Sequence, residues 1–245
     1  MKFLVIGDSC VDRFVYGNCD RICPEAPVPI MNPTNGTTNG GMAKNVQRNI
    51  SSLGVACDIL TNESIIIKTR YVDNKTNQIL LRIDENDKCD NVEINRLKNL
   101  EKYDAIVISD YCKGFLTEDN ISYICDQNNN VFIDTKKKFG KWITKASFVK
   151  INQYEYEYNK FLIEELSSEL FEKLIVTYGD KGCVYKDKTH PPFGCVEVKD
   201  LSGAGDTFLA AFAVNYTKTK DVISSIDFAQ QCASEIVKKK GVATI

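Results

Sequence analysis

Residues 200–206, with the sequence Asp-Leu-Ser-Gly-Ala-Gly-Asp, combine acids and glycines directly before an apolar run whose large side chains recur at helical spacing. The segment should therefore form the start of a buried helix. Gly203 and Gly205 lack a Cβ atom, which lets a phosphoryl group approach the backbone, and the N–H groups and positive dipole end of a helix start stabilise anions. Asp206 would then be placed to deprotonate a substrate hydroxyl during phosphoryl transfer. The alternative is an ordinary loop in which Asp206 only caps the helix.

Two further segments carry residue types that bind ligands. Asn152 and Glu155 follow an apolar segment, and an amide with a carboxylate at the carboxyl end of a strand suits a hard cation that keeps several waters. The glycines of residues 177–182, Thr-Tyr-Gly-Asp-Lys-Gly, would permit close approach of a ligand to the backbone. The alternatives are a polar strand terminus for the first pair and a plain hairpin turn for the second segment.

Composition disfavours several classes of protein. The chain has 245 residues, of which 43% are hydrophobic, as in a globular protein with one large core. Lys and Arg total 31 against 33 for Asp and Glu, and this net charge of −2 disfavours nucleic-acid binding. No apolar run approaches the ~20 residues of a membrane span, and the apolar start is too short for a signal peptide. We therefore expect a cytoplasmic protein with neither a membrane nor a nucleic acid as partner.

Short apolar segments alternate with helical patterns, which predicts βαβ units and a mostly parallel sheet flanked by helices. Strands are expected at residues 3–6, 105–109, 131–134, 148–151 and 174–177, and helices at 92–100, 122–125 and 163–170. Several of these strands end in polar residues. Because ligands bind beyond the carboxyl ends of the strands in an open α/β sheet, the polar residues should face one site.

Four other segments do not fit the parallel pattern and predict a small accessory sheet. They are short, strand-like and partly alternating, and they span approximately residues 13–17, 28–31, 65–72 and 78–83. Between them, residues 40–53 start with two glycines and carry an apolar helical face that Gly54 should end. The glycine-rich start of this helix is a second place where a ligand could approach the backbone.

Taken in order, these segments resemble the ribokinase-like (PfkB) family of carbohydrate kinases, and within it the D-glycero-β-D-manno-heptose 7-phosphate kinase branch. The matching segments are residues 7–8, 12–13, 21–29, 40–41, 45–49, 68–70, 81–84, 109–114 and 200–206. The resemblance covers nearly the whole chain. It implies a single kinase domain over residues 1–245, a Rossmann-like α/β fold with a β-sheet lid, and ATP and Mg²⁺ as cofactors.

The resemblance also implies roles for individual residues. Asp206 matches the catalytic base, in an anion-binding turn made by Gly203, Ala204 and Gly205. Asn152 and Glu155 match an Asn-x-x-Glu motif that helps to place Mg²⁺ and phosphate. The nucleotide-side positions are Thr177, Gly179, Gly182 and Gln230. The sugar-phosphate positions are Asp12, Gly41, Asn45, Arg70, Asp110 and Lys113, where carboxylates and amides suit sugar hydroxyls, and Arg and Lys suit a phosphate.

The chain departs from the family pattern in three places. Residues 55–67 replace a longer stretch that includes a helix, so we expect the edge of the main sheet to be trimmed. Gln230 stands where many relatives have an adenine-side Asn. The chain ends at Ile245, and no nucleotidyltransferase domain is expected.

The sequence therefore predicts an ATP-dependent kinase that phosphorylates the anomeric hydroxyl of heptose 7-phosphate, giving heptose 1,7-bisphosphate for ADP-heptose or another surface-glycan precursor. One alternative is a kinase of the same family that acts on another sugar or sugar phosphate. The other is a non-catalytic sugar-phosphate binding protein. A homodimer through the accessory sheet is expected, because a small lid has exposed strand edges and similar kinases dimerise.

Overall fold

Parallel strands form most of the main sheet in the computed structural model, which describes residues 1–194, 200–239 and 244–245. Within those ranges the strand order is β12-β11-β10-β9-β8-β7-β1-β4. The parallel strands are β1 (Lys2–Gly7), β4 (Ala56–Thr61), β7 (Ala105–Asp110), β8 (Val131–Thr135), β9 (Phe148–Asn152) and β10 (Leu174–Thr177). At one edge, β11 (Cys183–Tyr185) and β12 (Lys188–His190) pair in antiparallel fashion. All five predicted strands form, each to within one residue at either end.

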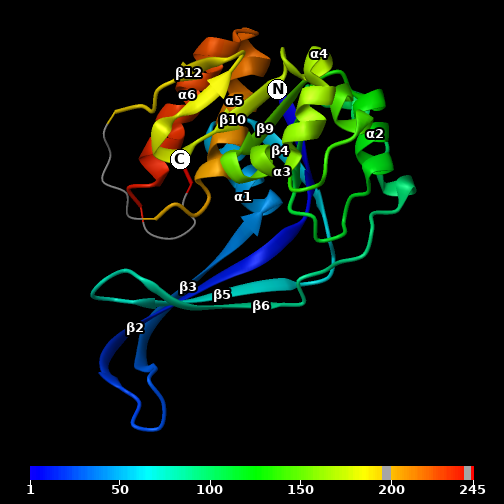
Figure 1. The fold of residues 1–245 in the computed structure, drawn as a ribbon. Coiled ribbons are helices and arrows are strands. Elements are labelled where there is room, and N and C mark those ends of the chain that lie inside the picture. Colours follow the sequence, from blue (N-terminus) through cyan, green and yellow to red (C-terminus); the bar gives the residue numbers. More distant parts are fainter. Residues whose placement is uncertain (195–199, 240–243) are drawn as a thin grey trace.

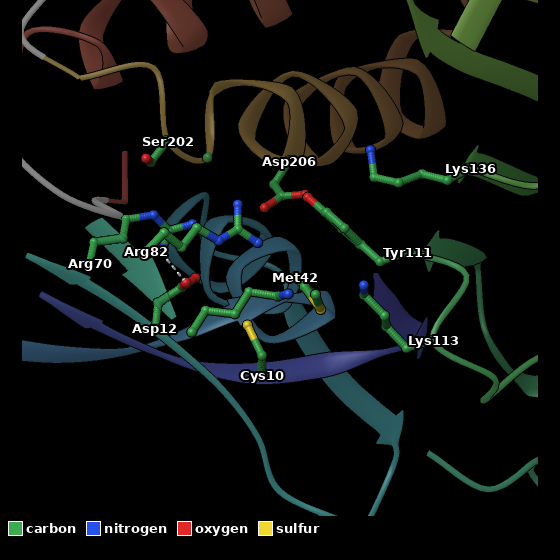
Figure 2. A pocket seen from close by; sticks show the side chains of 12 residues that line it. Cys10, Asp12, Met42, Arg70, Arg82, Tyr111, Lys113, Lys136, Ser202 and Asp206 are labelled. Carbon is green, nitrogen blue, oxygen red and sulfur yellow. Dashed lines mark hydrogen bonds and ion pairs between the residues drawn. The ribbon is translucent and has the colours of Figure 1, made fainter. Parts of the chain in front are cut away.

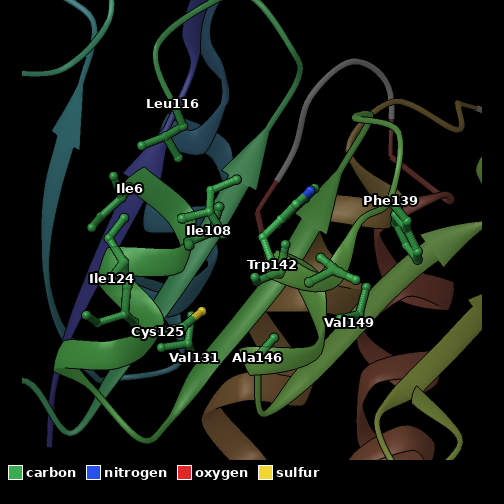
Figure 3. Close-up of a cluster of buried hydrophobic side chains, with 14 of the residues drawn as sticks. Ile6, Ile108, Leu116, Ile124, Cys125, Val131, Phe139, Trp142, Ala146 and Val149 are labelled. Carbon is green, nitrogen blue, oxygen red and sulfur yellow. The ribbon is translucent and has the colours of Figure 1, made fainter. Parts of the chain in front are cut away.

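Helices cover both faces of the main sheet (Figure 1). One face carries α2 (Glu118–Gln127), α3 (Gln153–Glu165), α4 (Ser167–Leu170) and the 3-10 helix η3 (Lys141–Lys145), and the other carries α1 (Ala43–Ser52), α5 (Ala204–Thr219) and α6 (Val222–Ile236). Figure 3 shows the first core, where Ile6 and Ile108 of the sheet pack with Ile124 and Cys125 of α2. Because successive side chains of a strand point to opposite faces, each buried strand contributes side chains to the cores on both faces of the sheet.

The predicted helices form less regularly than the predicted strands. The helix expected at residues 92–100 is wrong: the chain makes two 3-10 turns, Ile94–Arg96 and Leu100–Lys102, because Asn99 between them has a left-handed conformation with φ 54°. The helix expected at 122–125 starts earlier, where Thr117 and Asn120 form a capping box. The segment expected at 163–170 divides at Leu166 into the end of α3 and the short α4.

A second, smaller sheet projects from the main body (Figure 1). Its order is β3-β2-β5-β6, with β2 (Ser9–Ile22), β3 (Pro29–Met42), β5 (Ile66–Asp73) and β6 (Ile79–Glu85). The outer pairs are antiparallel, and β2 pairs with β5 in parallel. All four segments predicted for the accessory sheet overlap its strands. We call this sheet the lid, because its inner side chains line a cavity that also reaches the start of α5.

Candidate active site

Asp206 lies in the first turn of α5, behind Gly203, whose φ of 84° is the left-handed conformation that favours glycine. Two side chains hold the Asp206 carboxylate. The Asn45 Nδ2 of α1 donates to Oδ2 at 3.0 Å, and the Tyr111 hydroxyl donates to Oδ1 at 2.9 Å. Figure 2 shows Asp206 at the helix start beside Tyr111. The carboxylate is thus fixed by segments far apart in the sequence, as an active-site base requires.

The environment of Asp206 moves its pKa toward neutrality. The pKa of Asp206 is raised from 3.8 to about 6, chiefly by burial; the nearby Asp134 carboxylate also raises it, whereas the hydrogen bonds from Asn45 and Tyr111 and the charge of Lys150 lower it. A general base works best when its pKa lies near the working pH. Asp206 therefore combines the geometry and the proton affinity of a base for a hydroxyl.

A cavity of about 400 Å³ opens between Asp206 and the lid. Asp12 of β2 lines it and accepts a hydrogen bond of 2.5 Å from the Arg70 guanidinium of β5. A Cβ atom on residue 41 would lie 2.0 Å from Asp12 Oδ2, so the position needs glycine for this carboxylate to fit. Gly41 thus leaves the space that the Asp12 carboxylate occupies.

The cavity gathers more positive charge than the sequence assigned to it, which was that of Arg70 and Lys113. Its basic lining residues are Lys68, Arg70, Arg82, Lys113 and Lys136. Lys68 and Arg70 are two residues apart in β5, so their side chains lie on the same face of the strand. Arg70 lies directly opposite Arg82 of β6. Like charges placed opposite each other are destabilising, so this arrangement suits an anionic ligand. Alternation along Lys68-Thr69-Arg70 was the signal available in the sequence.

Three predicted substrate residues, Gly41, Asn45 and Asp110, are not part of the lining of this cavity. Asn45 is fully buried and contacts Asp206. Asp110 is 2% exposed, accepts hydrogen bonds from the Thr135 hydroxyl and the Cys112 backbone N–H, and lies 3.5 Å from Lys137. The prediction that Asp110 contacts the sugar is therefore not supported by this arrangement, because its partners cover it.

A second cavity, of about 630 Å³, lies on the other side of the α5 start. Its lining includes all four predicted nucleotide-side residues, Thr177, Gly179, Gly182 and Gln230. Gly182 has φ 85°, and a Cβ atom there would lie 2.1 Å from the carbonyl oxygen of His190. The turn therefore requires glycine at residue 182, because the backbone there has a positive φ and approaches the His190 carbonyl closely.

The start of α5 separates the two cavities. Ser202, Gly203 and Asp206 line the first, whereas Ala204 and Gly205 line the second. The Ala204 N–H itself makes a 3.3 Å turn bond to the carbonyl of Leu201. A group passing from one cavity to the other would meet the positive end of the helix dipole. The arrangement suits transfer of an anionic group from a ligand in the larger cavity to a hydroxyl beside Asp206.

The sequence profile of the pfkB family carbohydrate kinases matches residues 56–245. The chain belongs to this family. The predicted family and the predicted ATP-dependent carbohydrate kinase are thereby confirmed.

This pfkB-family chain also matches curated proteins over almost its whole length. It is 29% identical to the bifunctional protein HldE of a Nitratiruptor species over 292 residues, covering 99% of this chain and 63% of that protein. The HldE protein of Hydrogenovibrio crunogenus is 30% identical, with 100% and 61% covered. The chain thus spans less than two thirds of the length of these relatives. The alignments are longer than the chain, so the relatives carry residues within them that it lacks.

Solved structures share the fold. The crystal structure of ribokinase from Thermotoga maritima superimposes with a TM-score of 0.75 at 19% identity, covering 98% of this chain and 94% of that one. Phosphofructokinase-2 from Escherichia coli in complex with potassium gives a TM-score of 0.73 at 14% identity, with 98% and 93% covered. These matches confirm the predicted ribokinase-like fold.

The family resemblance implies Mg²⁺ near Asn152 and Glu155, but the pair does not fit direct coordination of a metal ion. The two residues form the capping box of α3: Asn152 Oδ1 accepts from the Glu155 N–H at 2.9 Å, and Glu155 Oε2 accepts from the Asn152 N–H at 2.8 Å. The other Glu155 oxygen pairs with Lys136 Nζ at 2.7 Å. Among the described residues, no group of three or more His, Cys, Asp or Glu side chains could hold a metal. We therefore assign no reaction step to a metal held by this pair.

Within the described ranges, no helix has both the length and the apolar character needed to cross a bilayer.

Proposed function

We propose that this protein transfers the γ-phosphoryl group of ATP to the anomeric hydroxyl of D-glycero-D-manno-heptose 7-phosphate. The observation that carries the proposal is the buried Asp206 carboxylate at the junction of two cavities, one of which is lined by five basic side chains. The curated relatives named bifunctional protein HldE and the sequence resemblance to the heptose 7-phosphate kinase branch support this acceptor.

In this proposal ATP occupies the larger cavity, against Thr177, Gly179, Gly182 and Gln230, and points its phosphates at the start of α5. The sugar lies in the cationic cavity with its anomeric hydroxyl beside Asp206. Asp206 takes the hydroxyl proton as the sugar oxygen bonds to the γ-phosphorus. The bond from that phosphorus to the bridging oxygen breaks, and ADP leaves with the electron pair. Positioning and electrostatics contribute most of the rate enhancement in such a transfer.

A panel of acceptors tests the substrate. We expect ADP release with heptose 7-phosphate to exceed release with ribose, fructose, fructose 6-phosphate and free heptose. An acceptor without the phosphate loses charge-assisted hydrogen bonds, each worth about 1.5–3 kcal/mol, which corresponds to about a 10- to 100-fold loss of kcat/KM per contact.

Other outcomes of the panel would redirect the proposal. An equal or faster rate with ribose or fructose 6-phosphate would assign the protein to a different sugar. Binding of sugar phosphates without ADP release from any mixture would identify a non-catalytic binding protein.

We also propose that the protein dimerises through the lid. The edge strand β6 exposes Ile79, Leu80, Leu81 and Ile83 to solvent, and an exposed apolar edge strand favours pairing with a second copy. Sedimentation velocity should show a dimer for the parent and a monomer for Leu81→Lys, which places a charge in the exposed row. A parent that sediments as an active monomer at tens of micromolar would contradict the proposal.

A further inference from the structure

Arg70 is the most constrained of the basic side chains in the substrate cavity. Its guanidinium pairs with Asp12 at 2.5 Å and lies over the Phe14 ring, 5.1 Å from the centroid. Because Asp12 also lines the cavity, the charge of Arg70 is balanced inside the cavity itself. This geometry fixes the Asp12 carboxylate for a sugar hydroxyl, and it pairs the Arg70 guanidinium with a carboxylate that itself faces the ligand.

Lys68 and Lys113 have a different arrangement. Both line the cavity, and both pair with Asp87, which does not line it. Lys68 Nζ lies 2.8 Å from Asp87 Oδ1 and 3.0 Å from Asp84 Oδ2, and Lys113 Nζ lies 2.5 Å from Asp87 Oδ2. The Asp87 carboxylate, which lies outside the cavity lining, therefore holds the two ammonium groups next to each other.

The two ammonium groups keep donors for a ligand. Each ammonium carries three N–H donors. Within the described part of the chain, Asp84 and Asp87 take two donors of Lys68, and Asp87 takes one of Lys113. The Lys68 side chain is only 6% exposed, so its third donor serves the cavity rather than bulk solvent. Adjacent free donors from two cations match the several oxygens of a phosphate.

The two lysines come from different parts of the fold. Lys68 belongs to β5 of the lid, whereas Lys113 follows β7 of the main sheet. The chain that leaves the lid packs on the Lys113 segment: the Cys89 N–H donates to the Lys113 carbonyl at 2.9 Å, and a Cβ atom on residue 114 would lie 2.4 Å from the Cys89 carbonyl oxygen. A ligand bound by both lysines therefore contacts the lid and the main domain together.

We propose that Lys68 and Lys113 form a two-lysine subsite for the phosphate that the acceptor sugar already carries, with Asp87 holding the two ammonium groups together and Arg70 serving to orient Asp12. The proposal rests on the proposed function in one respect: it takes the acceptor to be a phosphorylated sugar. The sequence resemblance left Arg70 and Lys113 as candidates for holding the phosphate; this proposal chooses Lys113 and gives Lys68 a binding role beside it.

Inorganic phosphate tests this subsite directly. Isothermal titration in the presence of excess ADP, which occupies the nucleotide cavity, should show phosphate binding to the parent. Lys68→Met and Lys113→Met should each weaken that binding at least about tenfold, the equivalent of one charge-assisted hydrogen bond. The matched control is Lys75→Met, which removes a lid lysine that pairs with Asp20 at 2.5 Å outside the cavity. Its phosphate affinity should equal that of the parent.

Kinetics separate the subsite from a general loss of structure. Lys113→Met should raise KM for the phosphorylated acceptor about tenfold or more while leaving KM for ATP within about twofold. Lys68→Arg, which keeps the charge, should retain most of the phosphate affinity if Lys68→Met fails to fold. Unchanged phosphate binding in Lys113→Met, a rise in KM for ATP alone, or no phosphate binding by the parent would each overturn the proposal.

The outcomes also separate this proposal from the proposed function. If heptose 7-phosphate is not a substrate but both methionine variants lose phosphate binding, the subsite stands and the substrate assignment falls. If heptose 7-phosphate is the best acceptor but its KM is unaffected by either substitution, the subsite falls and the substrate assignment stands.

Discussion

Asp206→Asn is expected to lower kcat at least about 100-fold, because an asparagine cannot accept the proton of the sugar hydroxyl. The substitution keeps the size of the side chain and one of its two hydrogen bonds, from Asn45 or from Tyr111. Affinities for ADP and for the sugar phosphate, measured by titration calorimetry, should therefore change little. Near-parental turnover in this variant would show that Asp206 is not the base.

Stability provides the control for that loss of activity. In the folded protein the pKa of Asp206 is raised to about 6 from its ordinary 3.8, so at neutral pH the folded state carries a buried charge that destabilises it. This penalty develops as the pH rises from the ordinary pKa of 3.8 to about 6 and is fully present above that, and an uncharged asparagine removes it. We expect Asp206→Asn at pH 7.5 to melt at or above the parental temperature. A variant that is both inactive and unfolded would leave the base role to be decided by the pH profile.

The second large effect is a loss of activity on acidification. The carboxylate form of Asp206 is the base, so kcat/KM should fall about tenfold for each pH unit below a midpoint near 6. A sugar phosphate also titrates at about this pH. The two titrations are distinguished by Tyr111→Phe, which removes the 2.9 Å hydrogen bond to Asp206 without altering the substrate.

Loss of that hydrogen bond should move the acidic limb of the kcat/KM profile to higher pH. A hydrogen bond to a charged group is worth about 1.5–3 kcal/mol, and 1.36 kcal/mol corresponds to one pKa unit, so we expect a shift of about one unit or more. The measurement is a pH series of kcat/KM for the parent and for Tyr111→Phe under the same conditions. A limb that stays in place would assign the titration to the substrate phosphate instead of Asp206.

Local sequence was enough to predict the parts of the molecule that depend on local physics. The buried strands were found because continuous apolar runs of that length bounded by polar residues have few other stable arrangements. The Gly-Ala-Gly-Asp turn was recognised because glycines before an apolar helical pattern specify a helix start. Thr177, Gly179 and Gly182 were assigned together from the family resemblance, and they do line one cavity.

Tertiary structure decided what depends on partners distant in the sequence. Only the fold shows that Tyr111 and Asn45 converge on Asp206 and that burial moves its pKa to about 6, because desolvation depends on every element packed around the carboxylate. Asn152 and Glu155 are residue types that suit a metal site. In the fold, however, their hydrogen bonds form a helix cap, and Glu155 also pairs with Lys136.

The positive charge of the substrate cavity is the clearest case of this division. The resemblance marks Lys113 and the segment 68–70, but nothing in the sequence shows that Lys68 and Lys113, two basic residues among 31, lie side by side. The lid places one beside the other, and Asp87 holds both. Electrostatic interactions act through space and not along the chain, so the residue types were readable from the sequence but their convergence on one cavity was decided by the tertiary structure.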